Sequence, residues 1–300
     1  MKIALTGASG FIGTELLVVM NRRDDVSVIA LTRDASGCED TERCEWRGTD
    51  YSEDSLKEAL RGADTVIHLA GVRGTENDPE KFAVNEQMTA NILDATAHCG
   101  AKRIVFASTM SVYNDDGLIP WKEDAPLKGR SCYGDSKAEC EKLITDFAER
   151  TGITYGIVRI AQVLGKGEKR RGMMNVFLDT ARDHGTIRVM GKSIAKKQYI
   201  YVKDLAEILM ILAAGNENLS DDENIIVNAG MPQAYTNLEV ARIVNEVYKN
   251  PAPIEYEDSY PEAGRPFLMD ITRLKTALGY EPLDMREAVM AFRDADTQPY

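Results

Sequence analysis

The 300-residue chain is 44% hydrophobic and 28% charged, an ordinary globular composition that excludes disordered, collagen-like and disulfide-scaffold classes. Its 36 lysines and arginines are outnumbered by 48 aspartates and glutamates, so the net charge is −12. An acidic surface repels phosphates, and we therefore expect neither a nucleic-acid-binding nor a membrane-binding surface. Any phosphate-bearing ligand must be held by a local structural device.

The cysteine content and the N-terminal segment favour a cytoplasmic protein. Five cysteines in irregular spacing do not form a disulfide framework, and the first residues lack the features of a secretion signal. No stretch approaches the ~20 apolar residues of a membrane span. None of the three histidines pairs with a cysteine at zinc-site spacing, so we expect no metal site.

Apolar runs alternate with helical patterns along most of the chain, which is typical of βαβ units and a parallel sheet. Strands are predicted at residues 2–6, 26–31, 44–46, 65–69, 103–107, 153–159 and 225–228. Helices are predicted at residues 10–22, 53–61, 79–99, 131–151, 173–184, 203–214 and 237–248. The pattern becomes less regular after about residue 165, and the proline-rich segment 250–266 is expected to form a surface loop or lid.

This order predicts an α/β fold with a Rossmann-type doubly wound parallel sheet and a smaller, mostly helical substrate-binding domain. We expect residues 1–166 and 199–229 to form the dinucleotide-binding domain. Residues 167–198 and 230–300 are expected to form the substrate-binding domain.

A glycine turn opens the chain. In KIALTGASGFIGTELL, Gly7, Gly10 and Gly13 stand between a predicted strand and an amphipathic helix. The first glycine permits a tight turn, the second lets a pyrophosphate approach the backbone, and the third lets helix pack on strand. The helix N-terminus offers unpaired N–H groups to the anion, which is the local device that an acidic protein needs. The alternative is a plain strand-to-helix turn.

The GxxGxxG spacing resembles that of the extended short-chain dehydrogenase/reductase family, also called the NAD-dependent epimerase/dehydratase family. Further matches follow in the family's order along nearly the whole chain: HLAG at 68–71, Asn85, FASTMSVY at 106–113, YGDSK at 133–137 and LGYEP at 278–282. The resemblance implies NAD or NADP as cofactor. It also implies cofactor contacts from Gly7, Gly10, Phe11, Ile12, Gly13, Thr32, Arg33, Asp50, Leu69, Ala70, Gly71, Asn85, Ser108, Tyr133 and Lys137.

Two residues bear on which dinucleotide is bound. An NAD site has an acidic residue at the end of the second strand, where this chain has Thr32 followed by Arg33, so NADP stays open. Alternatively, Arg33 stacks on adenine or points to solvent. Asp50 resembles the family's acidic residue near the adenine amino group, or it caps the helix that starts near Ser52. Asn85 is expected beside the cofactor cleft, or in local hydrogen bonds.

A tyrosine and a lysine are the candidate catalytic pair. Tyr133 and Lys137 are four residues apart on a predicted helix, so both leave the same face. A nearby ammonium favours the phenolate form of a tyrosine, which prepares Tyr133 for proton transfer. By resemblance Thr109 binds the reacting oxygen, although Ser108 and Ser111 are neighbours that can share this role or satisfy local backbone groups. With a nicotinamide cofactor that accepts the hydride, and with Tyr133 taking the proton, they can oxidise a secondary alcohol to a ketone.

The resemblance also implies a nucleotide-sugar substrate held by Ser111, Gln162, Lys197 and Arg265. Gln162 replaces the family's asparagine, and Lys197 replaces an arginine whose planar fork a lysine lacks. Lys197 and Arg265 can equally be solvated surface cations. Met110 and Ser111 stand where family dehydratases have an acidic pair, so a 4,6-dehydratase is not expected.

Three functions are compatible with these residues. The first is a 4-epimerase of a UDP-hexose or UDP-N-acetylhexosamine, and the second is an NADPH-dependent reductase of a keto sugar or small ketone. The third is a redox-sensing dinucleotide-binding protein without chemistry. The resemblance further implies a homodimer formed through the helices at 79–99 and 131–151, which alternatively only cover their own sheet.

Overall fold

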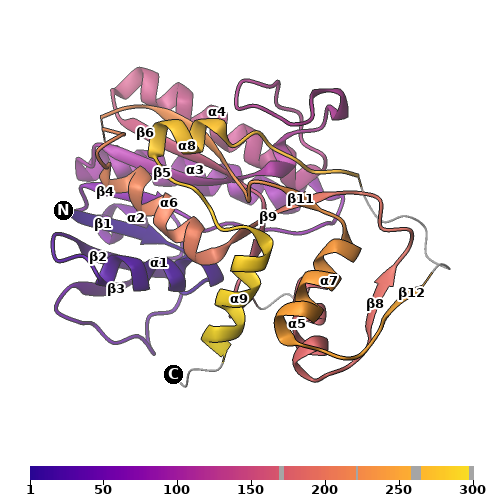
Figure 1. Cartoon of the computed structure of the whole chain (residues 1–300). Helices are drawn as coiled ribbons and strands as arrows, with labels where there is room; N and C mark the ends of the chain where they lie inside the picture. The colour runs from indigo at the N-terminus through magenta and orange to yellow at the C-terminus, as the bar shows by residue number, and fades with distance from the viewer. Residues whose placement is uncertain (169–171, 221, 258–264, 297–300) are drawn as a thin grey trace.

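A computed structural model of the chain describes residues 1–168, 172–220, 222–257 and 265–296. Its centre is a seven-stranded sheet in the order β10-β6-β5-β4-β1-β2-β3, in which every neighbouring pair runs parallel (Figure 1). The strands are β1 (Lys2–Thr6), β2 (Ser27–Thr32), β3 (Cys44–Gly48), β4 (Thr65–His68), β5 (Arg103–Thr109), β6 (Thr154–Ile160) and β10 (Ile225–Ala229). The predicted Rossmann-type sheet is confirmed, and each strand overlaps its expected range.

Helices cover both faces of this sheet. One apolar cluster joins the sheet to Leu16 of α1 and Leu205 of α6, and a second joins it to Leu56 of α2, Ile92 of α3 and Ile144 of α4. The strands β1, β2 and β5 are largely apolar, as is typical of parallel strands whose two faces are both buried. The helices are α1 (Phe11–Asn21), α2 (Glu53–Ala59), α3 (Pro79–Cys99), α4 (Cys132–Thr151) and α6 (Val202–Ala214).

The strand order positions the functional site. Strand β1 lies between β2 and β4, so the chain first builds β2 and β3 on one side of β1 and then crosses to the other side for β4. In such sheets ligands bind outside the carboxyl ends of the strands at this switch point. The glycine turn after β1 and the segment after β4 therefore meet at one crevice.

A smaller group of elements lies to one side of the sheet (Figure 1). It has its own apolar cluster, which includes Phe177, Val189, Val244 and Val289. Its elements are α5 (Met173–Arg182), β8 (Ile187–Met190), α7 (Asn237–Tyr248), β12 (Ile254–Glu257) and α9 (Met285–Asp296), and β8 pairs with β12. The remaining elements of the described residues are a three-stranded sheet of β7 (Gln162–Leu164), β9 (Lys197–Tyr201) and β11 (Ala234–Tyr235), the helix α8 (Thr272–Leu278) and two short 3-10 helices, Met110–Val112 and Asp116–Leu118.

The expectation of a loop throughout residues 250–266 is wrong in part. Residues 254–257 form β12, whose partner β8 lies more than sixty residues earlier in the chain. A four-residue strand with a distant partner leaves no periodic pattern in the sequence, which is why it was not expected. Residues 258–264 lie outside the described residues.

Within the described ranges, no helix is long and apolar enough to cross a membrane. The same residues hold no cluster of three or more histidine, cysteine or acidic side chains that could bind a metal ion.

Candidate active site

The glycine turn is built so that no side chain fits inside it. Gly7 has a φ of 70°, in the left-handed region that favours glycine. A Cβ on Gly13 would lie 2.3 Å from the carbonyl oxygen of Gly7. Gly10 is the N-cap of α1 and offers no side-chain cap, so the helix N-terminus stays open to an anion. These features fit the pyrophosphate of a dinucleotide.

A cleft of about 760 Å³ adjoins this turn. Gly7, Gly10, Thr32, Arg33 and Ser9 are among its lining residues, and the Thr32 and Ser9 hydroxyl oxygens lie 3.2 Å apart. Two of these, Thr32 and Arg33, were expected from the sequence as discriminators between NAD and NADP.

Asp50 is not among the residues that line this cleft, and its expected contact with adenine stays a prediction. Its carboxylate accepts a hydrogen bond of 2.9 Å from the backbone N–H of Ser52, the N-cap residue of α2, and hydrogen bonds with the side chain and the backbone of Ser52 lower the pKa of Asp50. The neighbouring Tyr51 lines the cleft and was not predicted. The backbone of Tyr51 has a φ of 66°, in the left-handed region, and nothing in the sequence pattern predicts this conformation.

The segment after β4 separates this cleft from a second one. Leu69, Gly71 and Val72 line both clefts. The buried amide of Asn85 accepts from the Val72 N–H at 2.7 Å and donates to the Val72 carbonyl at 2.9 Å. Asn85 is not among the residues that line either cleft, and through Val72 it holds the wall that the two clefts share. Its expected place beside the cofactor stays a prediction.

The second cleft, of about 580 Å³, brings the predicted catalytic residues together. Thr109 ends β5, and Tyr133 and Lys137 come from the first turns of α4. Ser108, Ser111, Gln162, Ile12 and Leu69 also line this cleft.

Lys137 is buried with its ammonium 3.8 Å from the centre of the Phe106 ring. Burial lowers the pKa of Lys137 to about 8, and the Cys140 thiol and the Glu141 carboxylate oppose this effect. Lys137 is therefore mostly charged at pH 7 and becomes neutral as the pH rises above about 8.

Tyr133 lies in the same cleft, where burial raises its pKa. The Arg73 guanidinium and a hydrogen bond with Thr109 act against burial and lower the pKa of Tyr133. The counter-charge expected at Tyr133 was Lys137, whose ammonium instead lies against Phe106. Arg73, which sequence reasoning missed, follows the HLAG motif by two residues and forms an ion pair of 3.0 Å with Glu168 at the cleft.

Two of the four predicted substrate residues lie elsewhere. Lys197 begins β9 and bridges to Phe267, and Arg265 is 65% exposed with its Nε 3.8 Å from Asp116 Oδ2. Neither is among the residues that line the two clefts, whereas Ser111 and Gln162 are. Phe11, predicted as a cofactor contact, packs against the apolar cluster of the smaller group of elements.

A glycine turn at the switch point of a parallel sheet, followed by a cleft holding Thr109, Tyr133 and Lys137, defines a dinucleotide-dependent enzyme of the short-chain dehydrogenase type. The model of the NAD dependent epimerase/dehydratase family matches residues 3–230. The chain belongs to this family, and its cofactor is NAD or NADP.

Relatives and solved structures agree with this assignment. The chain is 28% identical over 306 residues to UDP-glucuronic acid decarboxylase 6 of Arabidopsis thaliana, covering 96% of this chain and 87% of that protein. It is 27% identical over 316 residues to UDP-glucose 4-epimerase of Corynebacterium glutamicum, covering 96% and 94%. The structure of UDP-N-acetylglucosamine 4-epimerase from Bacillus cereus superposes with a TM-score of 0.86 at 28% identity, covering 98% and 96%.

Proposed function

We propose that this protein is a nucleotide-sugar 4-epimerase acting on a UDP-hexose or a UDP-N-acetylhexosamine. The observation that carries the proposal is the single cleft that holds Thr109, Tyr133 and Lys137 beside the dinucleotide cleft. The similarity to a UDP-glucose 4-epimerase and to a UDP-N-acetylglucosamine 4-epimerase supports the choice of substrate class.

In this proposal the protein's residues remove the proton of the C4 hydroxyl of the sugar and later return it. Tyr133, in the phenolate form that the Arg73 guanidinium favours against burial, takes the proton of the C4 hydroxyl, and Thr109 donates a hydrogen bond to the same oxygen. Bound NAD or NADP supplies the chemistry of accepting the C4 hydride and returning it. Tyr133 then gives its proton back to the C4 oxygen, which leaves the configuration at C4 inverted when hydride has returned to the other face.

The cleft residues also argue against water loss as the main reaction. Met110 and Ser111 follow Thr109, so the acidic pair expected of a family dehydratase is not present at these positions. Ser111 and Gln162 line the same cleft, which supports a role for both in binding the sugar. We further propose that residues 167–198 and 230–300 supply the remaining substrate contacts, with Lys197 and Arg265 as candidate cations for the diphosphate of the substrate.

The test is epimerisation by the purified protein without added cofactor. UDP-glucose, UDP-N-acetylglucosamine and UDP-glucuronic acid are incubated in turn, and the C4 epimers are followed by proton NMR. Interconversion is expected for at least one of them. Release of carbon dioxide with a pentose product would identify a decarboxylase instead. In a parallel assay with added NADPH and a keto sugar, stoichiometric NADPH consumption without epimerisation in the first assay would identify the reductase that Arg33 at the cleft favours.

Two variants connect turnover to the cleft. Tyr133→Phe is expected to lower turnover by ~10²-fold or more while leaving dinucleotide binding intact. Tyr256→Phe, at a tyrosine of β12 that is 49% exposed, removes the same atom elsewhere and should leave turnover unchanged. Equal activity of the two variants would place the proton transfer on another group.

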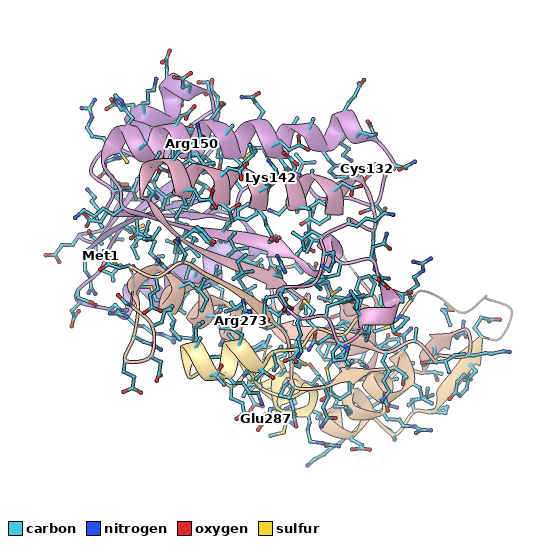
Figure 2. The ribbon with its side chains drawn as sticks, turned by 90° about the horizontal axis from the view of Figure 1, so that it is seen from above. Met1, Cys132, Lys142, Arg150, Arg273 and Glu287 are labelled. Carbon is cyan, nitrogen blue, oxygen red and sulfur yellow. The ribbon has the colours of Figure 1, made fainter. Side chains whose placement is uncertain are left out.

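We also propose that the protein is a cytoplasmic homodimer that associates through α3 and α4. These helices pack against one another and lie side by side along one outer face (Figure 2). Val84 on α3 is 49% exposed there. Light scattering should give twice the chain mass for the wild type, and the chain mass for Val84→Glu.

A further inference from the structure

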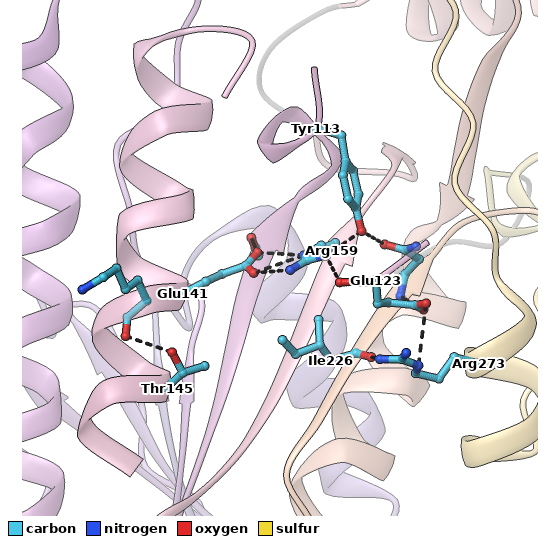
Figure 3. A network of polar contacts seen from close by, with 10 residues as sticks. Tyr113, Glu123, Glu141, Thr145, Arg159, Ile226 and Arg273 are labelled. Atoms are coloured by element: carbon cyan, nitrogen blue, oxygen red, sulfur yellow. Dashed lines mark hydrogen bonds and ion pairs between the residues drawn. The ribbon is translucent and has the colours of Figure 1, made fainter. Parts of the chain in front are cut away.

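A buried ion pair joins the sheet to the catalytic helix α4. Arg159 of β6 and Glu141 of α4 each have side chains that are 3% exposed. The Arg159 Nε lies 3.1 Å from both carboxylate oxygens, and its Nη2 lies 2.7 Å from Oε2 (Figure 3). Burying two charges is costly unless every donor and acceptor is satisfied, so the geometry of this pair is tightly constrained.

The Glu141 carboxylate also reaches the strand that carries Thr109. The Ser108 hydroxyl donates a hydrogen bond to Glu141 Oε1, and Ser108 directly precedes Thr109 at the end of β5. On α4, Glu141 follows Lys137 by four residues and Tyr133 by eight, so all three share a face of the helix. One carboxylate therefore connects both elements that carry the catalytic groups.

The other end of Arg159 is equally fixed. Its Nη1 donates to the Tyr113 hydroxyl at 2.6 Å and to the Glu123 carbonyl at 2.8 Å (Figure 3). The Tyr113 hydroxyl donates in turn to Asn228 Oδ1 at 2.8 Å. A guanidinium with this many partners cannot swing into the cleft, so Arg159 acts on the site only through Glu141.

The electrostatic surroundings of Lys137 include this carboxylate. Cys140 and Glu141, on the same helix, raise the pKa of Lys137 against the effect of burial. His68 of β4 interacts with the same ammonium, and burial lowers the pKa of His68 to about 3, so it is neutral. Phe106 of β5 covers the ammonium with its ring. Glu141 is thus a negative charge that favours the charged form of Lys137.

We propose that Glu141 and Arg159 are positioning residues of the reaction, which hold the Thr109 end of β5 against the face of α4 that carries Tyr133 and Lys137. The inference rests on the proposed catalytic roles of those three residues. In this proposal the Arg159 guanidinium holds Glu141 in place and does not bind the substrate.

The first test separates positioning from mere stability. Ser108→Ala removes the link from Glu141 to β5, and Glu141→Gln removes the charge while keeping the size. Arg103→Lys is the matched control, because Arg103 is a buried arginine at the opposite end of β5, where its Nε donates to the Leu212 carbonyl at 2.6 Å. Ser108→Ala and Glu141→Gln are expected to lower kcat by ~10-fold or more at nearly unchanged KM. Arg103→Lys should lower the unfolding midpoint and leave kcat unchanged.

The second test needs neither substrate nor cofactor. NMR of isotope-labelled lysine follows the titration of Lys137, whose signal is identified by its loss in Lys137→Met. In Glu141→Gln the pKa of Lys137 should fall below its wild-type value, while in Arg103→Lys it should not move. The inference is wrong if the Lys137 pKa does not move in Glu141→Gln, or if Ser108→Ala turns over as fast as Arg103→Lys. If the wild type converts no nucleotide sugar, the proposed function fails, and the Lys137 titration decides the inference by itself.

Discussion

The Thr6 hydroxyl lies 3.0 Å from Nδ1 of His68 and accepts hydrogen bonds of 3.1 Å from the backbone N–H groups of Leu69 and Ala70. Because its oxygen serves two donors, its own hydrogen points to Nδ1, and the neutral imidazole must carry its proton on Nε2. Nε2 faces the Thr89 hydroxyl at 3.2 Å. One buried threonine thus fixes both the histidine tautomer and the wall shared by the two clefts.

We predict that Thr6→Val weakens both folding and dinucleotide binding. Valine has nearly the same shape but leaves the N–H groups of Leu69 and Ala70 without an acceptor, which costs about 2 kcal/mol of unfolding free energy. Urea denaturation and an NAD titration measure the two effects. Thr6→Ser keeps the hydroxyl and should behave almost like the wild type; equal losses in both variants would mean that the threonine methyl group, not the hydroxyl, matters.

The glycine turn gives a second prediction. In Gly13→Ala the new Cβ would lie 2.3 Å from the Gly7 carbonyl oxygen and 2.7 Å from that of Ala8, so α1 must move away from β1. We expect a loss of about 2 kcal/mol in stability and weaker dinucleotide binding by calorimetry. Gly37→Ala is the control, since a Cβ there meets no atom within 4 Å. Unchanged binding in Gly13→Ala would show that the turn does not cradle the pyrophosphate.

A third prediction concerns pH and the buried ammonium of Lys137. Its pKa is about 8 in the folded protein against an ordinary value of 10.5. Between these values the unfolded chain holds a proton that the folded chain has released, so stability rises with pH across this window. Below pH 8 Lys137 is protonated in both the folded and the unfolded chain, and burial of its charge lowers the free energy of unfolding by about 3 kcal/mol.

Lys137→Met should therefore stabilise the protein at pH 7 by about 3 kcal/mol while abolishing turnover. Urea denaturation at pH 7 and at pH 9.5 should show the stability difference shrinking at the higher pH. Lys142→Met, at a lysine on the same helix that is 63% exposed and paired with Asp146, is the control and should change stability little. A difference independent of pH would contradict the assigned titration.

The fourth prediction concerns cofactor choice. Arg33 lines the cleft next to Thr32, which stands where an NAD site has its acidic residue, and Asp34 lines the same cleft. Arg33→Ala should lower the affinity for NADP about ten-fold and leave that for NAD nearly unchanged. Fluorescence titration with both dinucleotides measures the ratio. An equal loss for both would mean that Arg33 contacts the adenine rather than the phosphate.

Much of the architecture was predictable from local patterns. The ranges expected for α3 and α7 agree with the observed Pro79–Cys99 and Asn237–Tyr248, because long amphipathic helices repeat their signal over several turns. The strands β7, β8, β9, β11 and β12 were missed, because they are short and none of them is buried along its whole length as the equally short β4 is.

The sequence by itself determined the glycine turn and the Tyr133–Lys137 pair, because both depend on spacing within one turn or one helix. Only the tertiary structure decided that Glu141 and Arg159, which come from a helix and a strand, form a buried ion pair, and that Arg73 rather than Lys137 supplies the charge opposing burial at Tyr133. A charge acts through space, with a strength set by distance and burial. Neither quantity exists until the sheet has brought distant segments together.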